Sequence, residues 1–232
     1  MRNEPRHAVV TGSSAGIGRA IAQSLLDAGW RVSGLDLAAP TIEHVAFEPV
    51  QLNLSDAGEL ARVAGRLRDA CALVHAAGVL RVGRLEQLDA DDGALMWRLH
   101  VDAATRLCQA LVPAMAARGD GRVVFIGSRV AQGMPGRGQY AATKAALIAL
   151  ARSWAAEVAP QGVTLNVVSP AATATGMLND PARAASAPRL PPIGRLIEPG
   201  EIAALVNFLL SPSAAAITGQ DIAICGGASL PH

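Results

Sequence analysis

The sequence VVTGSSAGIG, residues 9–18, decides how this chain can be interpreted. A short valine-rich run leads into glycines at Gly12, Gly16 and Gly18, and a helical pattern begins within the same stretch. Glycines at such a turn allow a tight bend and a close approach to a pyrophosphate, while the helix offers free N–H groups and the positive end of its dipole. The stretch therefore predicts a strand–turn–helix unit that binds a dinucleotide. A glycine turn that only connects a strand to a helix is the alternative.

An acidic residue lies where such a site needs one. Asp36 closes the second predicted strand, 18 residues after Gly18. A carboxylate near this spacing binds the hydroxyl groups of an adenine ribose and repels a 2′-phosphate. Ala15, inside the glycine turn, supplies no cation for a phosphate, although Arg19 could attract one. The sequence therefore predicts NAD as the cofactor in preference to NADP; a turn residue at the strand end is the alternative for Asp36.

Strand-like and helix-like segments alternate along the whole chain. Such alternation is typical of βαβ units around a parallel sheet with helices on both faces. We therefore predict an α/β fold: one doubly wound Rossmann domain over residues 1–232, with a seven-stranded parallel sheet. The expected strands are 7–12, 31–37, 44–50, 72–77, 122–127, 163–169 and 221–226. The expected helices are 16–28, 56–69, 92–117, 139–158 and 199–210.

The composition excludes several classes of protein. The chain has 232 residues, 51% of them hydrophobic and 17% charged, with a formal net charge of +1. This is enough apolar sequence for a sizeable core, and the near-neutral charge without a basic block argues against nucleic-acid binding. The apolar runs are too short to span a membrane. Three widely spaced cysteines favour reduced thiols over a disulfide framework or a metal site, and with no apolar leader they predict a cytoplasmic protein.

One pair of residues carries chemistry. Tyr140 is the only tyrosine and Lys144 the only lysine, and a spacing of four residues puts both on one face of a helix. A tyrosine can exchange a proton with an alcohol or a carbonyl oxygen when a nearby cation favours its phenolate. Ser128 follows the fifth predicted strand, where an open α/β sheet places its ligands. We therefore predict proton transfer at Tyr140, with Lys144 and Ser128 assisting; taken alone, Ser128 could instead cap a turn.

Residues 171–200 have a different character. The segment holds five prolines and no regular hydrophobic period. A loop of this length in a small domain usually serves function. We expect it to form a lid over the substrate, because it follows the sixth predicted strand at the edge where ligands bind.

Taken together, these features resemble the short-chain dehydrogenase/reductase family over essentially the full length. The motifs are TGSSAGIG at 11–18, HAAG at 75–78, Ser128, the Tyr140–Lys144 pair, LNVVSP at 165–170 and the closing TGQDIAICGG. The resemblance implies Tyr140 as acid/base, Lys144 on the nicotinamide ribose and Ser128 on the substrate oxygen. It also implies cofactor contacts from Gly12, Ser14, Gly16, Ile17, Gly18, Asp36, Asn53, Leu54, Ala76, Gly78, Tyr140, Lys144, Pro170, Thr173 and Thr175. Homodimers or homotetramers, formed through the helices at 92–117 and 139–158, are the assembly that it implies.

Four residues depart from the family pattern. His100 takes the place of an asparagine that completes the catalytic set and holds a water linked to the lysine. Imidazole also passes protons, so we expect His100 to serve in the relay; a packed helix residue is the alternative. His75, Asn53 and Ala171 replace a usual asparagine, aspartate and glycine, and these changes mostly concern cofactor affinity.

Within the family, several stretches are similar to 2,3-dihydro-2,3-dihydroxybenzoate dehydrogenases: residues 72–83, 166–170 and 217–230. This similarity implies oxidation of a cyclic dihydrodiol acid. Arg81 and Arg84 follow the fourth predicted strand, close to the expected cleft, and either could pair with its carboxylate; a solvated loop arginine is the alternative for each. Two alternatives stay open. One is a reductase for 3-oxoacyl thioesters or general ketones, and the other is a dinucleotide-binding regulator without catalytic activity.

Overall fold

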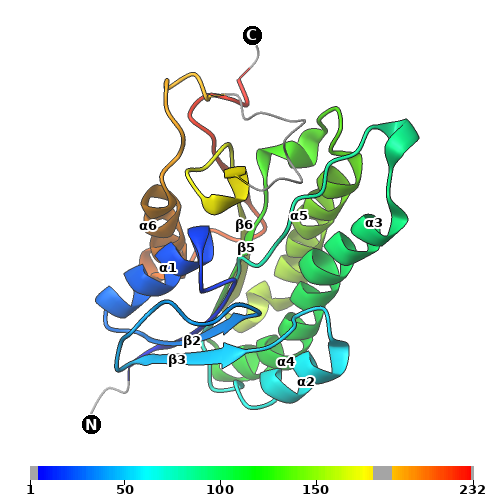
Figure 1. The fold of residues 1–232 in the computed structure, drawn as a ribbon. Helices are drawn as coiled ribbons and strands as arrows, with labels where there is room; N and C mark the ends of the chain where they lie inside the picture. Colours follow the sequence, from blue (N-terminus) through cyan, green and yellow to red (C-terminus); the bar gives the residue numbers. More distant parts are fainter. Residues whose placement is uncertain (1–4, 180–189, 231–232) are drawn as a thin grey trace.

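The computed structural model describes residues 5–179 and 190–230. Seven parallel strands form one sheet in the order β3-β2-β1-β4-β5-β6-β7 (Figure 1). The strands are β1 (His7–Thr11), β2 (Arg31–Asp36), β3 (Phe47–Gln51), β4 (Ala72–His75), β5 (Gly121–Ile126), β6 (Val163–Pro170) and β7 (Asp221–Ile224). The predicted parallel sheet is confirmed. Because the chain starts in the middle of the sheet and winds outward in both directions, a crevice forms where the strand order reverses, between β1 and β4.

Helices cover both faces of the sheet (Figure 1). On one face, α1 (Gly16–Asp27) and α6 (Pro199–Leu210) pack against one buried cluster. On the other face, α2 (Ala57–Ala64), α4 (Ala103–Arg118) and α5 (Gly138–Val158) cover a second. Short 3-10 segments connect these elements: η1 (Leu85–Gln87), η3 (Arg129–Gln132), η4 (Ala159–Gln161), η5 (Gly176–Asn179) and η7 (Pro212–Ala214).

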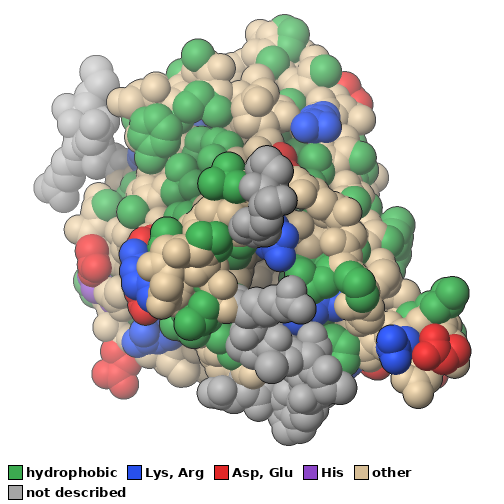
Figure 2. Space-filling view, turned by 90° about the horizontal axis from the view of Figure 1, so that it is seen from above, with side chains coloured by type: hydrophobic (Ala, Val, Ile, Leu, Met, Phe, Trp, Pro, Cys, Tyr) green, Lys and Arg blue, Asp and Glu red, His purple; other side chains and the backbone are tan. Residues whose placement is uncertain are grey.

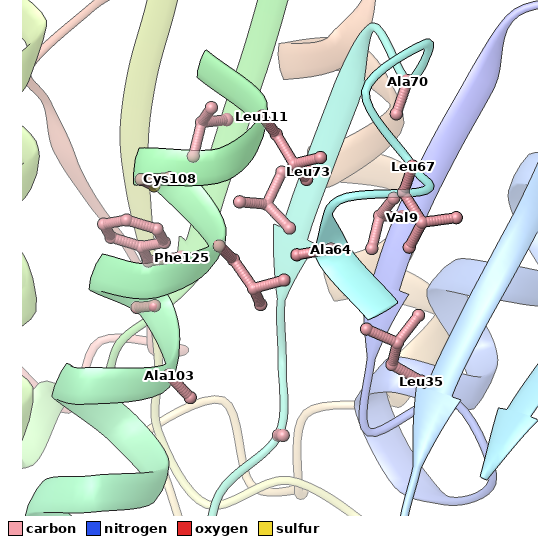
Figure 3. Packing of buried hydrophobic residues seen from close by; sticks show 14 of the residues in the cluster. Val9, Leu35, Ala64, Leu67, Ala70, Leu73, Ala103, Cys108, Leu111 and Phe125 are labelled. Atoms are coloured by element: carbon pink, nitrogen blue, oxygen red, sulfur yellow. The ribbon is translucent and has the colours of Figure 1, made fainter. Parts of the chain in front are cut away.

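The core between α4 and the sheet is made of aliphatic side chains around one phenylalanine (Figure 3). Leu73 from β4 and Phe125 from β5 meet Leu111 from α4, and all three are fully buried. Burying each such side chain stabilises the fold by roughly 1.5–3 kcal/mol. This packing fixes the positions of β4 and β5 relative to α4, and the carboxyl ends of both strands lie at the crevice.

The helix predicted at 92–117 is interrupted. It consists of α3 (Ala90–Trp97), a π-helical turn η2 (Arg98–Asp102) and α4. A π-turn inserts one extra residue and releases a backbone carbonyl from the regular helical hydrogen bonds. In this turn the carbonyl oxygen of Leu99 accepts a hydrogen bond from the side chain of His75. The sequence pattern of 92–117 predicted the helix correctly, and it carried no sign of the π-turn.

Two predicted boundaries differ from the structure by three or more residues. The helix predicted at 56–69 ends at Ala64, because the amides of Arg66 and Leu67 bond to carbonyls three residues back and form turns. The strand predicted at 44–50 begins only at Phe47, after a tight turn closed by its amide on the carbonyl of His44. Neither difference changes which residues reach the crevice.

No helix in the described part of the chain is long and apolar enough to cross a membrane. The same residues bring no three His, Cys, Asp or Glu side chains together as a metal site. The proposed lid at 171–200 is described only at its two ends, and residues 180–189 lie outside the described residues.

Candidate active site

A large cleft runs along the carboxyl ends of the strands. Its volume is about 1460 Å³, more than a drug-sized ligand needs and suited to a dinucleotide together with a substrate. Residues that follow β1, β2, β4, β5 and β6 line it, and so do both described ends of the 171–200 segment. Figure 2 looks down on this edge of the sheet, where apolar side chains and some Lys or Arg side chains surround the centre of the face.

The glycine turn lines the cleft between β1 and the start of α1. Gly12 and Gly16 have φ angles of +69° and +54°, in the left-handed region that favours glycine. A Cβ atom on Gly12 would lie 2.9 Å from the backbone of Ala77, so only glycine fits between β1 and the loop after β4. Helix α1 begins without a capping side chain and without an acidic residue in its first turn. Its first N–H groups therefore suit an anion, and the turn fits a pyrophosphate.

Asp36 lies at one end of the cleft, held by two backbone hydrogen bonds. The amide of Ser14 donates to its Oδ2 at 2.8 Å, and the amide of Ala38 donates to its Oδ1 at 2.9 Å. A carboxylate accepts about four hydrogen bonds, so both oxygens keep capacity for ribose hydroxyl groups. Arg19, the cation considered for a 2′-phosphate, instead donates to the hydroxyl of Thr41 and does not line the cleft.

Among residues 5–179 and 190–230, Lys144 is the only buried cation at the centre of the site. Its Nζ donates to the carbonyl oxygen of Ile126 at 2.8 Å, which joins α5 to the end of β5. The same atom lies 5.7 Å from the centroid of the Tyr140 ring. Burial lowers the pKa of Lys144 to about 8, because the charged form loses its hydration. An ammonium has three donors, and the two that Ile126 leaves fit the hydroxyl groups of a nicotinamide ribose.

Ser128 lies two residues after β5 and lines the cleft with Tyr140. Its Oγ accepts a hydrogen bond from the amide of Val130 at 3.2 Å and thereby caps η3. The capping role considered from sequence is therefore present. It does not compete with a role in binding a substrate, because accepting this bond leaves the hydroxyl proton free to donate to a substrate oxygen.

His75 is a buried brace between the sheet and the π-turn. Its Nδ1 lies 3.0 Å from the hydroxyl of Thr11, which already accepts the amides of Ala76 and Ala77. The hydroxyl proton must therefore go to Nδ1, so Nε2 carries the ring proton and donates to the carbonyl of Leu99 at 3.1 Å. Burial and, second, the charge of Lys144 lower the pKa of His75 to about 3, so its ring is neutral.

His100 occupies the π-turn and is fully buried. Its Nε2 accepts the amide of Val79 at 3.0 Å, so the ring proton lies on Nδ1, which donates to the hydroxyl of Thr143 at 2.8 Å. Both ring nitrogens are thus occupied, and the ring packs edge-on against Tyr140 at 5.6 Å between centroids. Burial, followed by the charge of Lys144, lowers the pKa of His100 well below its usual range. This geometry favours His100 as a packed helix residue. Its role in the proton relay stays a prediction.

The structure brings most of the predicted site residues into one cleft. Two of them do not line it: His100 lies behind Tyr140, and Ser14 supports Asp36 through its amide. Arg129 lines the cleft and was missed by sequence reasoning; its position directly after Ser128 was the available signal. The residues that line the cleft as expected are Gly12, Gly16, Ile17, Gly18, Asp36, Asn53, Leu54, Ala76, Gly78, Ser128, Tyr140, Lys144, Pro170, Thr173 and Thr175.

Comparison with known proteins agrees with this geometry. Residues 12–229 match the family profile described as Enoyl-(Acyl carrier protein) reductase. A solved structure described as a short chain dehydrogenase/reductase family protein superimposes with a TM-score of 0.91 at 33% identity, with all of both chains covered. The chain belongs to the short-chain dehydrogenase/reductase family. It is therefore an oxidoreductase of this family, as the resemblance implied.

Members of the family with different activities are similar to this chain to the same degree. A 3-oxoacyl-(acyl-carrier-protein) reductase of Vibrio harveyi is 36% identical, covering 98% of each chain. A 2,3-dihydro-2,3-dihydroxybenzoate dehydrogenase of Escherichia coli is also 36% identical, covering 95% of this chain and 96% of the relative. A 3-oxoacyl reductase of Agrobacterium tumefaciens, solved with NADP bound, has a TM-score of 0.85 at 30% identity, covering 96% and 93% of the two chains.

The His100→Asn variant tests the relay. Since both ring nitrogens are occupied and the ring is neutral, we expect the pH profiles of kcat for wild type and variant to superimpose on the acidic side. An imidazole in the relay would instead add an ionisation near its ordinary pKa of about 6.5. NAD affinity and thermal stability serve as controls for folding. An acidic limb that shifts in the variant while NAD affinity is retained would restore the relay role.

Proposed function

We propose that this protein is an NAD-dependent dehydrogenase that oxidises a cyclic dihydrodiol acid, such as 2,3-dihydro-2,3-dihydroxybenzoate, to an aromatic catechol acid. The observation that carries a dehydrogenase function is the meeting of Ser128, Tyr140 and Lys144 in one cleft beside the glycine turn. The choice of substrate is supported by the dihydrodiol dehydrogenase relative and by the similar segments at 72–83, 166–170 and 217–230.

Each residue has a defined part in the proposed reaction. A bound nicotinamide dinucleotide supplies hydride transfer at the substrate carbon. Ser128 donates its free hydroxyl proton to the substrate oxygen and holds it in the cleft. Tyr140 takes the proton of the substrate hydroxyl on its phenolate oxygen, and the buried Lys144 cation favours that phenolate. The oxidised ring then tautomerises to a catechol, and this aromatisation favours the oxidative direction.

The preference for NAD rests on charge at the adenine end of the cleft. Asp36 is the only charged residue there among the described lining residues, and Leu37, its neighbour in the cleft, is neutral. A carboxylate binds two ribose hydroxyl groups and repels a phosphate dianion. The relative that was solved with NADP does not change this preference, because the bound cofactor is a property of that protein.

A 3-oxoacyl-thioester reductase is the second candidate, favoured by the Vibrio harveyi relative. A non-catalytic regulator is third, because it would leave the joint presence of Ser128, Tyr140 and Lys144 in the cleft without a role.

We further propose a cytoplasmic homodimer or homotetramer built through the helices at 92–117 and 139–158, and a lid over the substrate at 171–200. The described ends of this segment contribute Met177 and Leu190, among others, to the cleft wall.

A two-sided substrate panel tests the proposal, with Tyr140→Phe as the control protein. We expect kcat/KM for the dihydrodiol acid with NAD to exceed that for 3-oxoacyl thioesters with NADH or NADPH. Losing the phenol should lower kcat by roughly 100-fold or more and leave NAD binding nearly intact, because the hydroxyl transfers a proton but contributes little to dinucleotide binding. A preference for the thioester would establish the second candidate, and NAD binding without any turnover would favour the regulator.

Asp36→Ala tests the cofactor preference. Loss of the carboxylate removes charged hydrogen bonds to the ribose, so we expect NAD affinity to fall by about tenfold or more and the gap to NADP to narrow. Asp27→Ala, at the far end of α1, is a matched control that should change neither. The measurement is kcat/KM for both cofactors; equal values in the wild type would contradict the preference.

A further inference from the structure

Positive charge dominates the substrate half of the cleft. Among the described residues that line it, the only carboxylate is Asp36, at the adenine end, while the cations are Arg81, Arg129, Arg137 and Lys144. In the view of Figure 2, most acidic side chains lie toward the margin of the face, away from its centre. A cleft lined by one sign of charge attracts ligands of the other sign.

The arginines in this region are not equivalent. Arg81 pairs with Asp92, with 3.3 Å between Nε and Oδ1, so part of its charge is already neutralised. Arg84, considered for the same role from sequence, has a side chain that is 79% exposed beside Glu86 and does not line the cleft. Arg129 lines the cleft and is partly buried, and its guanidinium makes no ion pair or hydrogen bond with residues 5–179 or 190–230.

Arg129 also has a fixed relation to the reacting atoms. It follows Ser128 directly, and consecutive Cα atoms lie about 3.8 Å apart. The reach of the arginine side chain from this position places an anion that it binds at the same end of the cleft as the substrate atoms beside Ser128. A carboxylate on a neighbouring ring carbon meets this condition. The phosphate of an extended pantetheine arm, many bonds from the reacting carbonyl, would lie farther from Ser128 than such a carboxylate.

We propose that Arg129 binds a carboxylate carried by the substrate next to the reacting carbon and thereby selects acids over neutral alcohols. The guanidinium fork matches a carboxylate with two parallel N–H···O bonds. In a cleft that excludes water, such a pair both strengthens binding and fixes which ring carbon faces Ser128 and Tyr140. The inference rests on the proposed function in one respect, namely that the chemistry takes place at Ser128 and Tyr140.

The test compares an acid with its neutral counterpart. Binding of 2,3-dihydroxybenzoate and of 2,3-dihydroxybenzamide is measured by calorimetry on the NAD-saturated protein, in wild type and in Arg129→Gln. We expect the wild type to prefer the acid and the variant to lose about 10- to 100-fold in acid affinity, with amide affinity nearly unchanged. Arg129→Lys should recover part of the loss, since it keeps the charge without the planar fork. Arg84→Gln is the matched control and should behave as wild type.

The outcomes separate the two proposals. Equal binding of acid and amide by the wild type, or no binding of either, would overturn the role of Arg129. The role would also be overturned if Arg129→Gln lost affinity for a 3-oxoacyl phosphopantetheine substrate and kept its affinity for the acid. An Arg129-dependent preference for the acid, without oxidation of the dihydrodiol acid by the wild type, would support the role of Arg129 while rejecting the proposed substrate.

Discussion

The hydrogen bond from the Lys144 ammonium to the carbonyl oxygen of Ile126 is the interaction on which the site depends. It joins the helix that carries Tyr140 to the strand that leads to Ser128. The three polar groups therefore lie together at the carboxyl edge of the sheet. The bond holds the ammonium in a buried position, where the loss of hydration makes the charged form costly. In the free protein this loss of hydration destabilises the charged form of Lys144. A bound ribose and the phenolate of Tyr140 would compensate the loss.

Two neutral histidines surround this single cation. His75 joins the ends of β1 and β4 to the released carbonyl of the π-turn, and His100 joins the loop after Gly78 to α5. Each ring uses one nitrogen as donor and the other as acceptor, so neither adds a second positive charge beside Lys144. The two departures from the family pattern therefore fit each other: both asparagines are replaced by rings that brace the backbone around Tyr140.

The sequence was sufficient to predict the sheet, its helices and nearly all of the cleft, because these features follow from local patterns. Apolar strands, the glycines of residues 11–18 and the four-residue spacing of Tyr140 and Lys144 each have a direct geometric consequence. The π-turn and the tautomers of His75 and His100 had no local signal, since they depend on hydrogen bonds between segments far apart in the chain. Arg129 was missed because its role depends on which arginines of the cleft already have a carboxylate partner, and the sequence does not show this. Arg81 pairs with Asp92, whereas Arg129 pairs with no carboxylate in the described chain.

Lysine-selective isotope labelling gives the most direct test, because Lys144 is the only lysine and its side chain yields a single NMR signal. Following that signal with pH in the free protein measures its pKa without assignment. A buried ammonium bonded to Ile126 predicts a pKa of about 8. A value at the usual 10.5 would contradict the loss of hydration that the buried position of Lys144 implies.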